Sequence, residues 1–487
     1  MNDRTLFRLA LAIVAAVTLV RVIVLIVSPL NLYPDEAQYW WWAQTPDLGY
    51  FSKPPMIGWI VWLTTAIFGN AEWAIRLASP LIHAGTALLL FAVGKRAFDA
   101  RVGFWSALAY LTLPGVSYSS VLISTDVPLL FFWALALYAF FRALEDPSWR
   151  WTVLCGAAIG FGMLSKYAMA YFVLCAILAA IAVPAARRFV FGVRGLAVLA
   201  LGLLILSPNI WWNAQHHFAT VGHTEHNADW THAHFDPASI LGFLGGQFGV
   251  FGPILMLGLI AGWWRVVRKS PRAPNELLLT AFSLPPILII TVQAFISEAN
   301  ANWAATAYIA AVPLAVAALL RWWKARGLWA SFALNAVAML VMWAVFAAPP
   351  VADTIGLGNA FKRMEGWRAV GQAVASEAAA KPYGAIATNN RSVIAELLYY
   401  AQPRNIPVLD WDRTPAVRDH FQMTLRLTPA LGRHVLLAID PSSASTVLAT
   451  FDSHALIRTV TIPVGGHRVR ATALYDAHDY RGPQAHP

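Results

Sequence analysis

Charged residues are scarce in this sequence: only 12% of its 487 residues are Asp, Glu, Lys or Arg. A soluble globular chain carries charge at roughly 25% of its positions, which is what covers its water-facing surface. Hydrophobic residues make up 58% of the chain, and the mean hydropathy is +0.56. These values exclude a soluble enzyme, a disordered protein and, despite a net charge of +10, a nucleic-acid-binding protein.

Cysteine is also scarce, with two residues, and no glycine-rich phosphate loop or nucleotide-binding βαβ pattern is present on the predicted cytoplasmic side. Cys155 and Cys175 both lie in apolar runs, so neither is expected to hold a metal or an exported disulfide. The apolar run from about Leu9 to Pro29 is longer than a signal-peptide core and lacks a small-x-small cleavage site. We therefore expect an uncleaved first membrane span.

Long apolar runs dominate what remains. A membrane-spanning helix needs about 20 mostly apolar residues. The sequence predicts about eleven spans, at 9–29, 74–94, 102–120, 127–144, 151–165, 167–186, 195–212, 238–264, 277–297, 303–320 and 327–347. Only Ser165–Lys166 interrupts the apolar stretch 151–183, and Met56–Gly69 is too short to span comfortably, so it is expected to be an interfacial helix.

The distribution of basic residues tests this count. With a cytoplasmic N-terminus and eleven spans, most Lys and Arg residues of the membrane part fall inside, and only Lys53, Arg76 and Lys166 fall outside. Merging 151–183 into one span, or counting 56–69 as a span, moves many of those charges outside and violates the positive-inside rule. The acids then gather in the outer loops: Asp35, Glu36, Asp47, Glu72, Asp126, Glu225, Asp229, Asp236 and Glu298. Chemistry is therefore expected on the outer face.

The composition changes from about Val351 onward, where Lys, Arg, Asp and Glu reach ordinary soluble frequencies. Short strands are predicted at 383–388, 407–410, 434–439, 457–462 and 469–475, and helices at 366–380 and 391–401. The predicted fold is therefore mainly α. A polytopic membrane bundle at 1–350 is followed by a small extracytoplasmic α/β domain at 351–487.

The first outer loop carries the strongest chemical pattern, Tyr33–Trp42 (YPDEAQYWWW). Pro34 suits the first turn of a helix, and Asp35 and Glu36 suit the positive end of its dipole. Helical spacing places Asp35, Tyr39 and Trp42 on one face. One interpretation is an interfacial helix with aromatic belt anchors. The other is a catalytic carboxylate beside aromatic rings that stack a sugar.

Two further polar positions follow on the outer side. Lys53 is the only lysine of its loop and precedes Pro54 and Pro55, which stiffen the backbone. Such a cation is suited to a phosphate, although any anionic lipid would also attract it. Asp126, at the outer start of a span, is either a plain helix cap or a site carboxylate.

Together these residues resemble the GT-C membrane glycosyltransferases, specifically the bacterial family 39, protein mannosyltransferase-like group and the lipid A aminoarabinose transferase. The likeness covers roughly residues 5–320. It rests on Asp35 and Glu36, on Gly49–Pro55 (GYFSKPP), on Asp126 before Val-Pro-Leu, on Ser207–His216 (SPNIWWNAQH) and on Glu298–Trp303 (EANANW). An outer C-terminal domain is common in that group as well.

The resemblance implies an inverting glycosyltransferase that moves a monosaccharide from a polyprenyl-phosphate donor to an envelope acceptor: lipid A, lipopolysaccharide core, another glycolipid or a protein. The family's catalytic acids fall on Asp35, Glu36 and Asp126, and its phosphate-binding lysine on Lys53. The substrate-binding candidates are Tyr39, Trp42, His216, Glu298, Asn302 and Trp303. The location implied is the cytoplasmic (inner) membrane, with the site and the C-terminal domain facing outside, in the periplasm of a Gram-negative cell.

A metal cofactor is left open by the sequence. In the aminoarabinose transferase group a glutamate precedes the lysine and helps to hold a metal, but here that residue is Ser52. The loop 213–237 contains His216, His217, His223, His226, His232 and His234. His223 and His226 have a spacing compatible with a divalent metal, although structural or acceptor-binding roles suit these histidines as well.

Three alternative functions remain from the sequence. An oligosaccharide or O-antigen ligase would use the same outer-face chemistry with a pyrophosphate-linked glycan. A transporter is disfavoured because the acids lie in loops rather than at mid-membrane. A non-catalytic membrane scaffold would keep the fold without needing Asp35.

Overall fold

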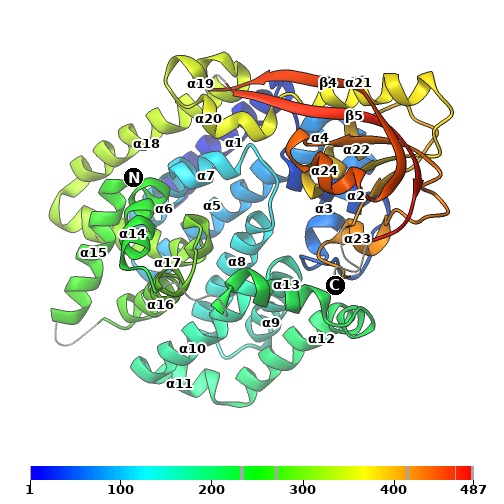
Figure 1. The fold of residues 1–487 in the computed structure, drawn as a ribbon. Helices are drawn as coiled ribbons and strands as arrows, with labels where there is room; N and C mark the ends of the chain where they lie inside the picture. Colours follow the sequence, from blue (N-terminus) through cyan, green and yellow to red (C-terminus); the bar gives the residue numbers. More distant parts are fainter. Residues whose placement is uncertain (1, 231–234, 269–272, 413–415, 467, 484–487) are drawn as a thin grey trace. The chain divides into compact units, whose positions relative to one another are not determined.

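The structure is a computed structural model that describes residues 2–230, 235–268, 273–412, 416–466 and 468–483 (Figure 1). The chain divides into two compact units. The first, called here the helical unit, comprises Met1–Ile26, Lys53–Ile60 and Arg76–Trp343. The second, called the mixed unit, comprises Val27–Ser52, Val61–Ile75 and Ala344–Pro487.

The helical unit is a bundle of α-helices with short 3-10 turns. Its elements are α1 (Asp3–Val27), α5 (Ala78–Ala97), α6 (Ala100–Thr112), α7 (Pro114–Ser119), α8 (Asp126–Glu145), α9 (Trp149–Ser165), η1 (Tyr167–Met169), α10 (Ala170–Ala182), α11 (Pro184–Val190), α12 (Val193–Gln215), α13 (Ala219–Ala228), α14 (Pro237–Phe251), α15 (Pro253–Arg268), α16 (Pro274–Ile296), η3 (Ala301–Ala304), α17 (Ala307–Trp322) and α18 (Lys324–Ala347). Helix α3 (Met56–Phe68) crosses the division between the units.

Small residues allow the helices of this unit to approach closely, as is usual where lipid removes the hydrophobic drive between helices. Helix α9 packs along α12 through Gly156 and Gly160. A Cβ added at Gly160 would lie 2.7 Å from the Cβ of Ile205, and one at Gly156 would lie 3.0 Å from the carbonyl oxygen of Val198. Alanine at either position would therefore push the two helices apart.

Six described helices are long and apolar enough to cross a membrane, or seven if the bent pair α14–α15 is one span. The chain is thus a multi-pass membrane protein, and the count of eleven spans stays a prediction. The predicted break at Ser165–Lys166 is present, since α9 ends at Ser165. The predicted run 238–264 is not straight: α14 and α15 are bent by 110°, because Gly252 has a φ of +86° and Pro253 opens the next helix.

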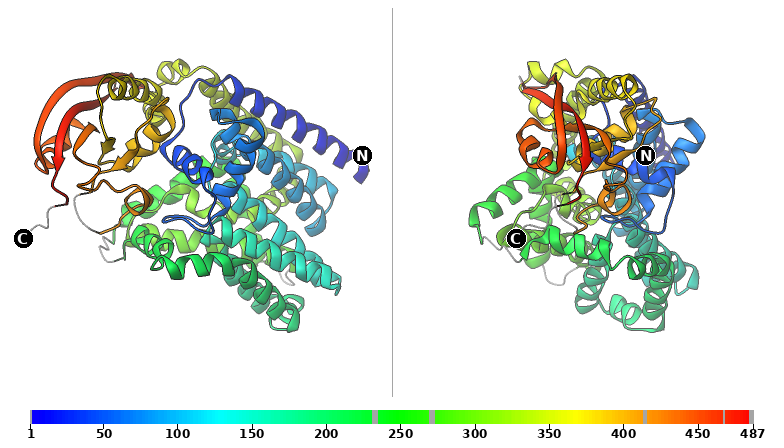
Figure 2. Two further views of the ribbon diagram at one scale, coloured as in Figure 1. Left: turned by 90° about the vertical axis from the view of Figure 1, so that its right-hand side faces the viewer. Right: turned by 45° about the vertical axis from the view of Figure 1, so that its right-hand side comes forward.

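The mixed unit is built on a five-stranded sheet of order β2-β1-β3-β5-β4. Its strands are β1 (Ala385–Thr388), β2 (Val408–Asp410), β3 (His434–Ile439), β4 (Phe451–Val464) and β5 (Arg468–Tyr480). Strands β2, β1 and β3 are parallel, and β3, β5 and β4 pair antiparallel. Figure 2 shows β4 and β5 as a long twisted ribbon at the end of the chain.

The helices of the mixed unit come from both ends of the sequence. They are α2 (Pro34–Gln44), α4 (Glu72–Arg76), α19 (Pro350–Thr354), α20 (Gly358–Phe361), η4 (Lys362–Met364), α21 (Trp367–Ala380), α22 (Arg391–Tyr400), α23 (His420–Thr424), η5 (Pro441–Ser443) and α24 (Ala444–Leu448). Helix α2, from the first predicted outer loop, packs on α22 of the C-terminal segment.

The predicted fold class is confirmed, including the small C-terminal sheet. All five predicted strands and both predicted tail helices are present, with β4 and β5 extending beyond their predicted ends. The predicted boundary between 1–350 and 351–487 lies close to the start of Ala344–Pro487, but the mixed unit also includes two segments of the first loop. Assignment of these parts to the membrane and to the outside stays a prediction.

Candidate active site

Asp126 is a buried predicted site carboxylate with side-chain partners on two other segments of the helical unit. It occupies the first position of α8, after Thr125, and only 9% of the residue is exposed. Its Oδ1 lies 2.7 Å from Nζ of Lys166, and its Oδ2 accepts a hydrogen bond of 2.9 Å from Nδ2 of Asn302. Both oxygens are therefore bound by side chains distant in sequence, which a plain helix cap does not require.

Lys166 reaches Asp126 because the backbone leaves the helix at that point. α9 ends at Ser165, Lys166 is extended with φ −163° and ψ 135°, and η1 begins at Tyr167. Charge-assisted hydrogen bonds of this kind are stronger than neutral ones, and in a buried place they compensate the cost of removing both charges from water. The pair with Lys166 thus fixes the position of the Asp126 carboxyl group at the start of α8.

A second group of hydrogen-bonded side chains begins at Tyr167, the residue after Lys166. The hydroxyl of Tyr167 donates to Oδ1 of Asn209 at 2.7 Å and accepts from Nδ2 of Asn213 at 3.2 Å. Both asparagines belong to the run Ser207–His216 and are buried on α12. The ring of His216 stacks on Trp212, with centroids 4.0 Å apart, and its Nδ1 lies 2.8 Å from the carbonyl oxygen of Trp212.

In the predicted turn Glu298–Trp303, Asn302 contacts Asp126, whereas Glu298 and Trp303 have other surroundings. Asn302, in η3, donates to Asp126, whereas the side chain of Glu298 is exposed and its carbonyl oxygen accepts from Nε2 of Gln293. Trp303 is half-buried and packs against the apolar core. Of this turn, Asn302 is the residue with a direct bond to a predicted catalytic acid.

The two acids of α2 have different roles. Glu36 is 1% exposed, and its Oε2 accepts the backbone N–H of Tyr33 at 2.9 Å, which closes a capping box at the start of the helix. The side chain of Asp35 is 41% exposed and pairs through Oδ1 with Nη2 of Arg391 at 2.9 Å. Glu36 therefore builds the helix end, and Asp35 remains accessible.

Arg391 anchors this end of α2. It opens α22 directly after β1, at the carboxyl edge of the parallel strands, where α/β sheets commonly bind ligands. Its Nη1 donates to Oε1 of Gln38 at 2.6 Å while Nη2 holds Asp35. The guanidinium fork therefore fixes the direction of the Asp35 carboxylate from two points one helical turn apart.

The carboxyl edge of the same strands contains a further buried acid, Asp410 at the end of β2. The residue is 2% exposed, and its Oδ2 has no hydrogen-bond partner among the described residues. Burial, reinforced by the nearby charges of Asp419 and Asp412 and only partly offset by Arg426, raises the pKa of Asp410 to about 8. This edge thus contains a carboxyl group that takes up a proton near neutral pH.

The predicted aromatic platforms of α2 are buried in the mixed unit. Trp42 is 1% exposed and lies parallel to Tyr50, with ring centroids 4.3 Å apart and planes at 1°. Tyr39 packs on Trp42 at 5.4 Å, and His420 meets both Trp42 and Tyr50 edge-on. One face of Trp42 is therefore covered, so this ring acts first as core packing; sugar binding by Tyr39 and Trp42 stays a prediction.

Lys53 is half-buried and is the first residue of a segment of the helical unit, and Pro54 and Pro55 after it are buried.

Among the predicted metal ligands, His226 is exposed and the half-buried His223 lies 3.0 Å from the side-chain amide of Asn227. No cluster of three or more candidate ligands among the described residues includes either histidine. His232 and His234 lie outside the described residues.

A cationic cavity of about 390 Å³ lies in the mixed unit. Its charged lining comes from Lys362, Arg363, Arg468, Arg470 and one acid, Asp440, and the first turn of α22 adds Ser392. Arg470 lies over the ring of Trp367 at 3.4 Å and donates to the carbonyl oxygen of Lys362 at 2.9 Å. The carboxylate of Asp440 accepts hydrogen bonds from the backbone N–H and from the hydroxyl of Ser442.

Sequence reasoning missed Lys166 and Arg391 as site residues. Lys166 had a visible signal, since it is the one charge that interrupts an apolar stretch of more than thirty residues. Arg391 had none, because it is one of many arginines in a tail of ordinary composition. Both are recognised only from their bonds to Asp126 and Asp35.

The chain is similar to known proteins in family pattern, in full-length sequence and in fold. Residues 52–212 match the family described as dolichyl-phosphate-mannose-protein mannosyltransferase. The chain is 39% identical over 437 residues to the lipid A galacturonosyltransferase RgtD of Rhizobium johnstonii, covering 89% of this chain and 91% of that protein. It is 30% identical over 202 residues to the lipopolysaccharide core galacturonosyltransferase RgtA of the same organism, covering 41% of this chain and 40% of that one.

A solved structure has the same fold. The crystal structure of ArnT from Cupriavidus metallidurans bound to undecaprenyl phosphate superposes with a TM-score of 0.66 at 16% identity, covering 96% of this chain and 97% of that one. The overlap includes the C-terminal sheet as well as the helical bundle. A fold of this kind is therefore present in an experimentally determined structure.

Proposed function

This chain belongs to the GT-C family of membrane glycosyltransferases, and on that premise we propose that it transfers a galacturonosyl group from a polyprenyl phosphate to lipid A. The observation that carries the proposal is the similarity to the galacturonosyltransferase RgtD, which extends over almost the full length of both chains. An envelope acceptor at the outer face of the inner membrane agrees with the predicted topology. The 1–350 part would then span the membrane, and the 351–487 part would face the periplasm.

The reaction needs a proton acceptor, a cation for the leaving phosphate and a negative charge near the sugar. A hydroxyl oxygen of the acceptor attacks the anomeric carbon, the bond from that carbon to the phosphate oxygen breaks, and the lipid phosphate leaves with the electron pair. The hydroxyl proton passes to a carboxylate. The leaving phosphate is already anionic, so it needs a cation rather than a proton.

We assign the proton-accepting role to Asp35, because it is the more accessible of the two acids and its direction is fixed by Arg391. Asp126, held by Lys166 and Asn302, supplies a fixed negative charge that favours the positive charge developing on the sugar. Lys53, stiffened by two prolines, takes the phosphate. No metal enters these steps; one held by His223 and His226 stays a separate prediction.

The cationic cavity supports a binding role for the mixed unit. Neither Lys362 nor Arg468 forms an ion pair with another described residue, so both charges are available to an anion. Lipid A and its neighbours offer phosphates and sugar carboxylates to such a cavity. In our proposal the cavity holds an anionic group of the acceptor while Lys53 holds that of the donor.

Mass spectrometry of lipid A tests the function. Lipid A from cells that express the chain should contain a species heavier by one hexuronic acid, and deletion or Asp35→Asn should remove it. An unchanged lipid A together with a lost sugar on core oligosaccharide, O-antigen or protein would overturn the acceptor. A lost polymer rather than a lost monosaccharide would favour the ligase alternative.

The cavity has its own test in purified protein. Lys362→Ala with Arg468→Ala should raise KM for lipid A roughly 10-fold or more while leaving KM for the donor unchanged, because surface cations act on the partner that they contact. Arg458→Ala, which removes an exposed arginine of β4 that pairs with Glu377 of α21, is the matched control. Equal effects of both variants would remove the cavity from acceptor binding.

A further inference from the structure

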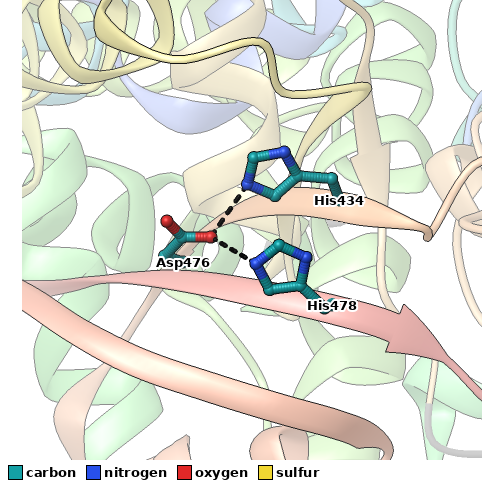
Figure 3. A group of neighbouring side chains, drawn as sticks. All are labelled: His434, Asp476 and His478. Atoms are coloured by element: carbon teal, nitrogen blue, oxygen red, sulfur yellow. Dashed lines mark hydrogen bonds and ion pairs between the residues drawn. The ribbon is translucent and has the colours of Figure 1, made fainter.

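Three polar side chains meet on one face of the sheet, on strands β3 and β5 (Figure 3). His434 and His478 are directly opposite each other in the antiparallel register. Asp476 precedes His478 by two residues, so its side chain points to the same face. Sheet geometry alone therefore brings two imidazoles and one carboxylate together, without any bend or insertion.

The distances match those between ligands of one metal ion. Nε2 of His434 lies 2.9 Å from Oδ1 of Asp476, and Nε2 of His478 lies 3.1 Å from the same oxygen. In a tetrahedral zinc site with bonds of about 2.0–2.1 Å, neighbouring ligand atoms are roughly 3.3 Å apart. These two distances are thus within a few tenths of an ångström of that spacing, and all three candidate ligand atoms lie within 4.8 Å of one another.

The surroundings hold the ligands in place and leave the site open. The imidazole rings of His434 and His478 stack with centroids 4.4 Å apart and planes at 8°. Nζ of Lys381 lies 2.6 Å from Oδ2 of Asp476, which leaves Oδ1 directed at the histidines. The side chains of His434 and His478 are 25% and 44% exposed, so an ion and a fourth water ligand have access from solvent.

The ammonium of Lys381 opposes a cation at this place, but it binds the carboxylate oxygen that is not turned to the histidines. Groups that hydrogen-bond a ligating carboxylate from outside are common around metal sites, where they fix the direction of the ligand. Without an ion, Nε2 of His434 is hydrogen-bonded to Oδ1 of Asp476, and Nε2 of His478 lies within ion-pair distance of the same oxygen.

We propose that His434, Asp476 and His478 form a divalent transition-metal site, for zinc in the first place, which clips β3 to β5 in the mixed unit. Two imidazoles and one carboxylate with an open position are a ligand set that zinc accepts. The site lies on the C-terminal sheet and is independent of the roles proposed for Asp35 and Lys53. It stabilises the sheet rather than taking part in sugar transfer.

The test measures metal binding by the whole protein, purified in detergent without a polyhistidine tag. After chelation and readdition of zinc, elemental analysis should find one zinc per chain, and cobalt should give the intense visible absorption of a tetrahedral site. His478→Ala and Asp476→Asn should each lower zinc affinity by more than the roughly 10–100-fold that loss of an outer-shell partner costs. His454→Ala, which changes an exposed histidine of β4, should leave affinity unchanged.

Folding is checked by glycosyl transfer, which these variants should retain. Zinc should raise Tm of the wild type and of His454→Ala, since a ligand that binds only the folded state stabilises it, but not of His478→Ala. Equal zinc content in the wild type and in His478→Ala, or no zinc in either, would overturn the site.

Discussion

Asp126 and Asp35 are both proposed site carboxylates that pair with a cationic side chain, yet their surroundings differ. The Asp126 side chain is 13% exposed, and both of its oxygens are bound, by Lys166 and Asn302. The Asp35 side chain is 41% exposed, and the bond from Arg391 occupies Oδ1. The first carboxylate is enclosed and charge-compensated, whereas the second is oriented but open.

This difference separates two ways in which a charge serves an enzyme. Removing one partner of a buried ion pair with good geometry strongly destabilises the folded protein, because the remaining charge is left without compensation. A half-exposed pair contributes little to stability, about 0–1 kcal/mol. Its proposed role is therefore to orient a carboxylate for proton transfer. Substitutions should therefore lower stability more at Asp126 than at Asp35.

The largest expected effect is on turnover at Asp35. Asp35→Asn keeps the size and hydrogen-bonding shape of the side chain but cannot take a proton, so turnover should fall about 10²–10⁴-fold. Donor affinity and Tm should stay near those of the wild type. Single-turnover assays with purified protein give the rate, and full activity of this variant would transfer the role of base to Asp126.

The next effect is on stability at Lys166. Lys166→Ala leaves Asp126 buried without its cation, which should cost about 3 kcal/mol, the lower end of the range for buried pairs because Lys166 keeps 23% exposure. Unfolding in detergent should show the loss. The double variant Lys166→Met with Asp126→Asn should regain most of it, and failure of that rescue would contradict an ion-pair origin.

Lys53 differs from both acids because it is expected to bind the donor phosphate before the reaction as well as during it. Lys53→Ala should weaken donor binding roughly 10–100-fold, as expected for loss of a hydrogen bond to a charged group worth about 1.5–3 kcal/mol. Lys53→Arg should recover only part of this, since a planar fork does not replace a compact ammonium. Donor titration measures the affinity, and an effect on rate alone would remove Lys53 from the phosphate.

Arg391 tests whether Asp35 needs its orientation. Arg391→Ala should lower turnover roughly 10-fold, because a misdirected base loses part of the advantage of proximity, while Tm changes little. Arg391→Lys should not restore the rate fully, since it cannot hold Asp35 and Gln38 together. Arg368→Ala, which removes a comparable pair with Glu72 in the same unit, is the control and should keep its rate.

Asp410 is a buried acid that forms no ion pair with another described residue, and here the expected effect is on the pH dependence of stability. Its pKa of about 8 exceeds the ordinary value of 3.8, so the folded state binds the proton more tightly than the unfolded state. The resulting stability is complete below about pH 4 and is lost progressively as the pH rises to 8. Asp410→Asn should flatten this dependence, as hydrogen exchange in β2 at pH 5 and pH 8 would measure.

Local pattern was enough to predict most of the fold. The apolar runs, the helix start at Pro34 and the break at Lys166 are properties of neighbouring residues, and the short alternating segments of the tail predict its strands. The bend of 110° after α14 was missed, although Gly252–Pro253 is a recognisable breaker. A run of apolar residues conceals such a break because hydropathy is averaged along it.

The partners of the site residues could not be predicted in the same way. Lys166 lies 40 positions from Asp126, and Arg391 lies 356 positions from Asp35. Nothing in the local sequence of either acid specifies such a partner, since the pairing arises only when distant helices meet. The burial of Trp42 behind Tyr50 is of the same kind: the sequence identifies an aromatic ring but not which of its faces is covered.

The composition of the mixed unit has a consequence for biosynthesis. Helix α2 leaves the ribosome early, but the arginine that orients Asp35 is made 356 residues later, near the end of translation. Until then α2 lacks α22, on which it packs, and its buried aromatic face has no cover from His420. A chain truncated before β1 would keep every predicted membrane span and both proposed site acids but would lack Arg391, so on the proposed roles we expect the enzyme to become active only when the C-terminal segment has been made.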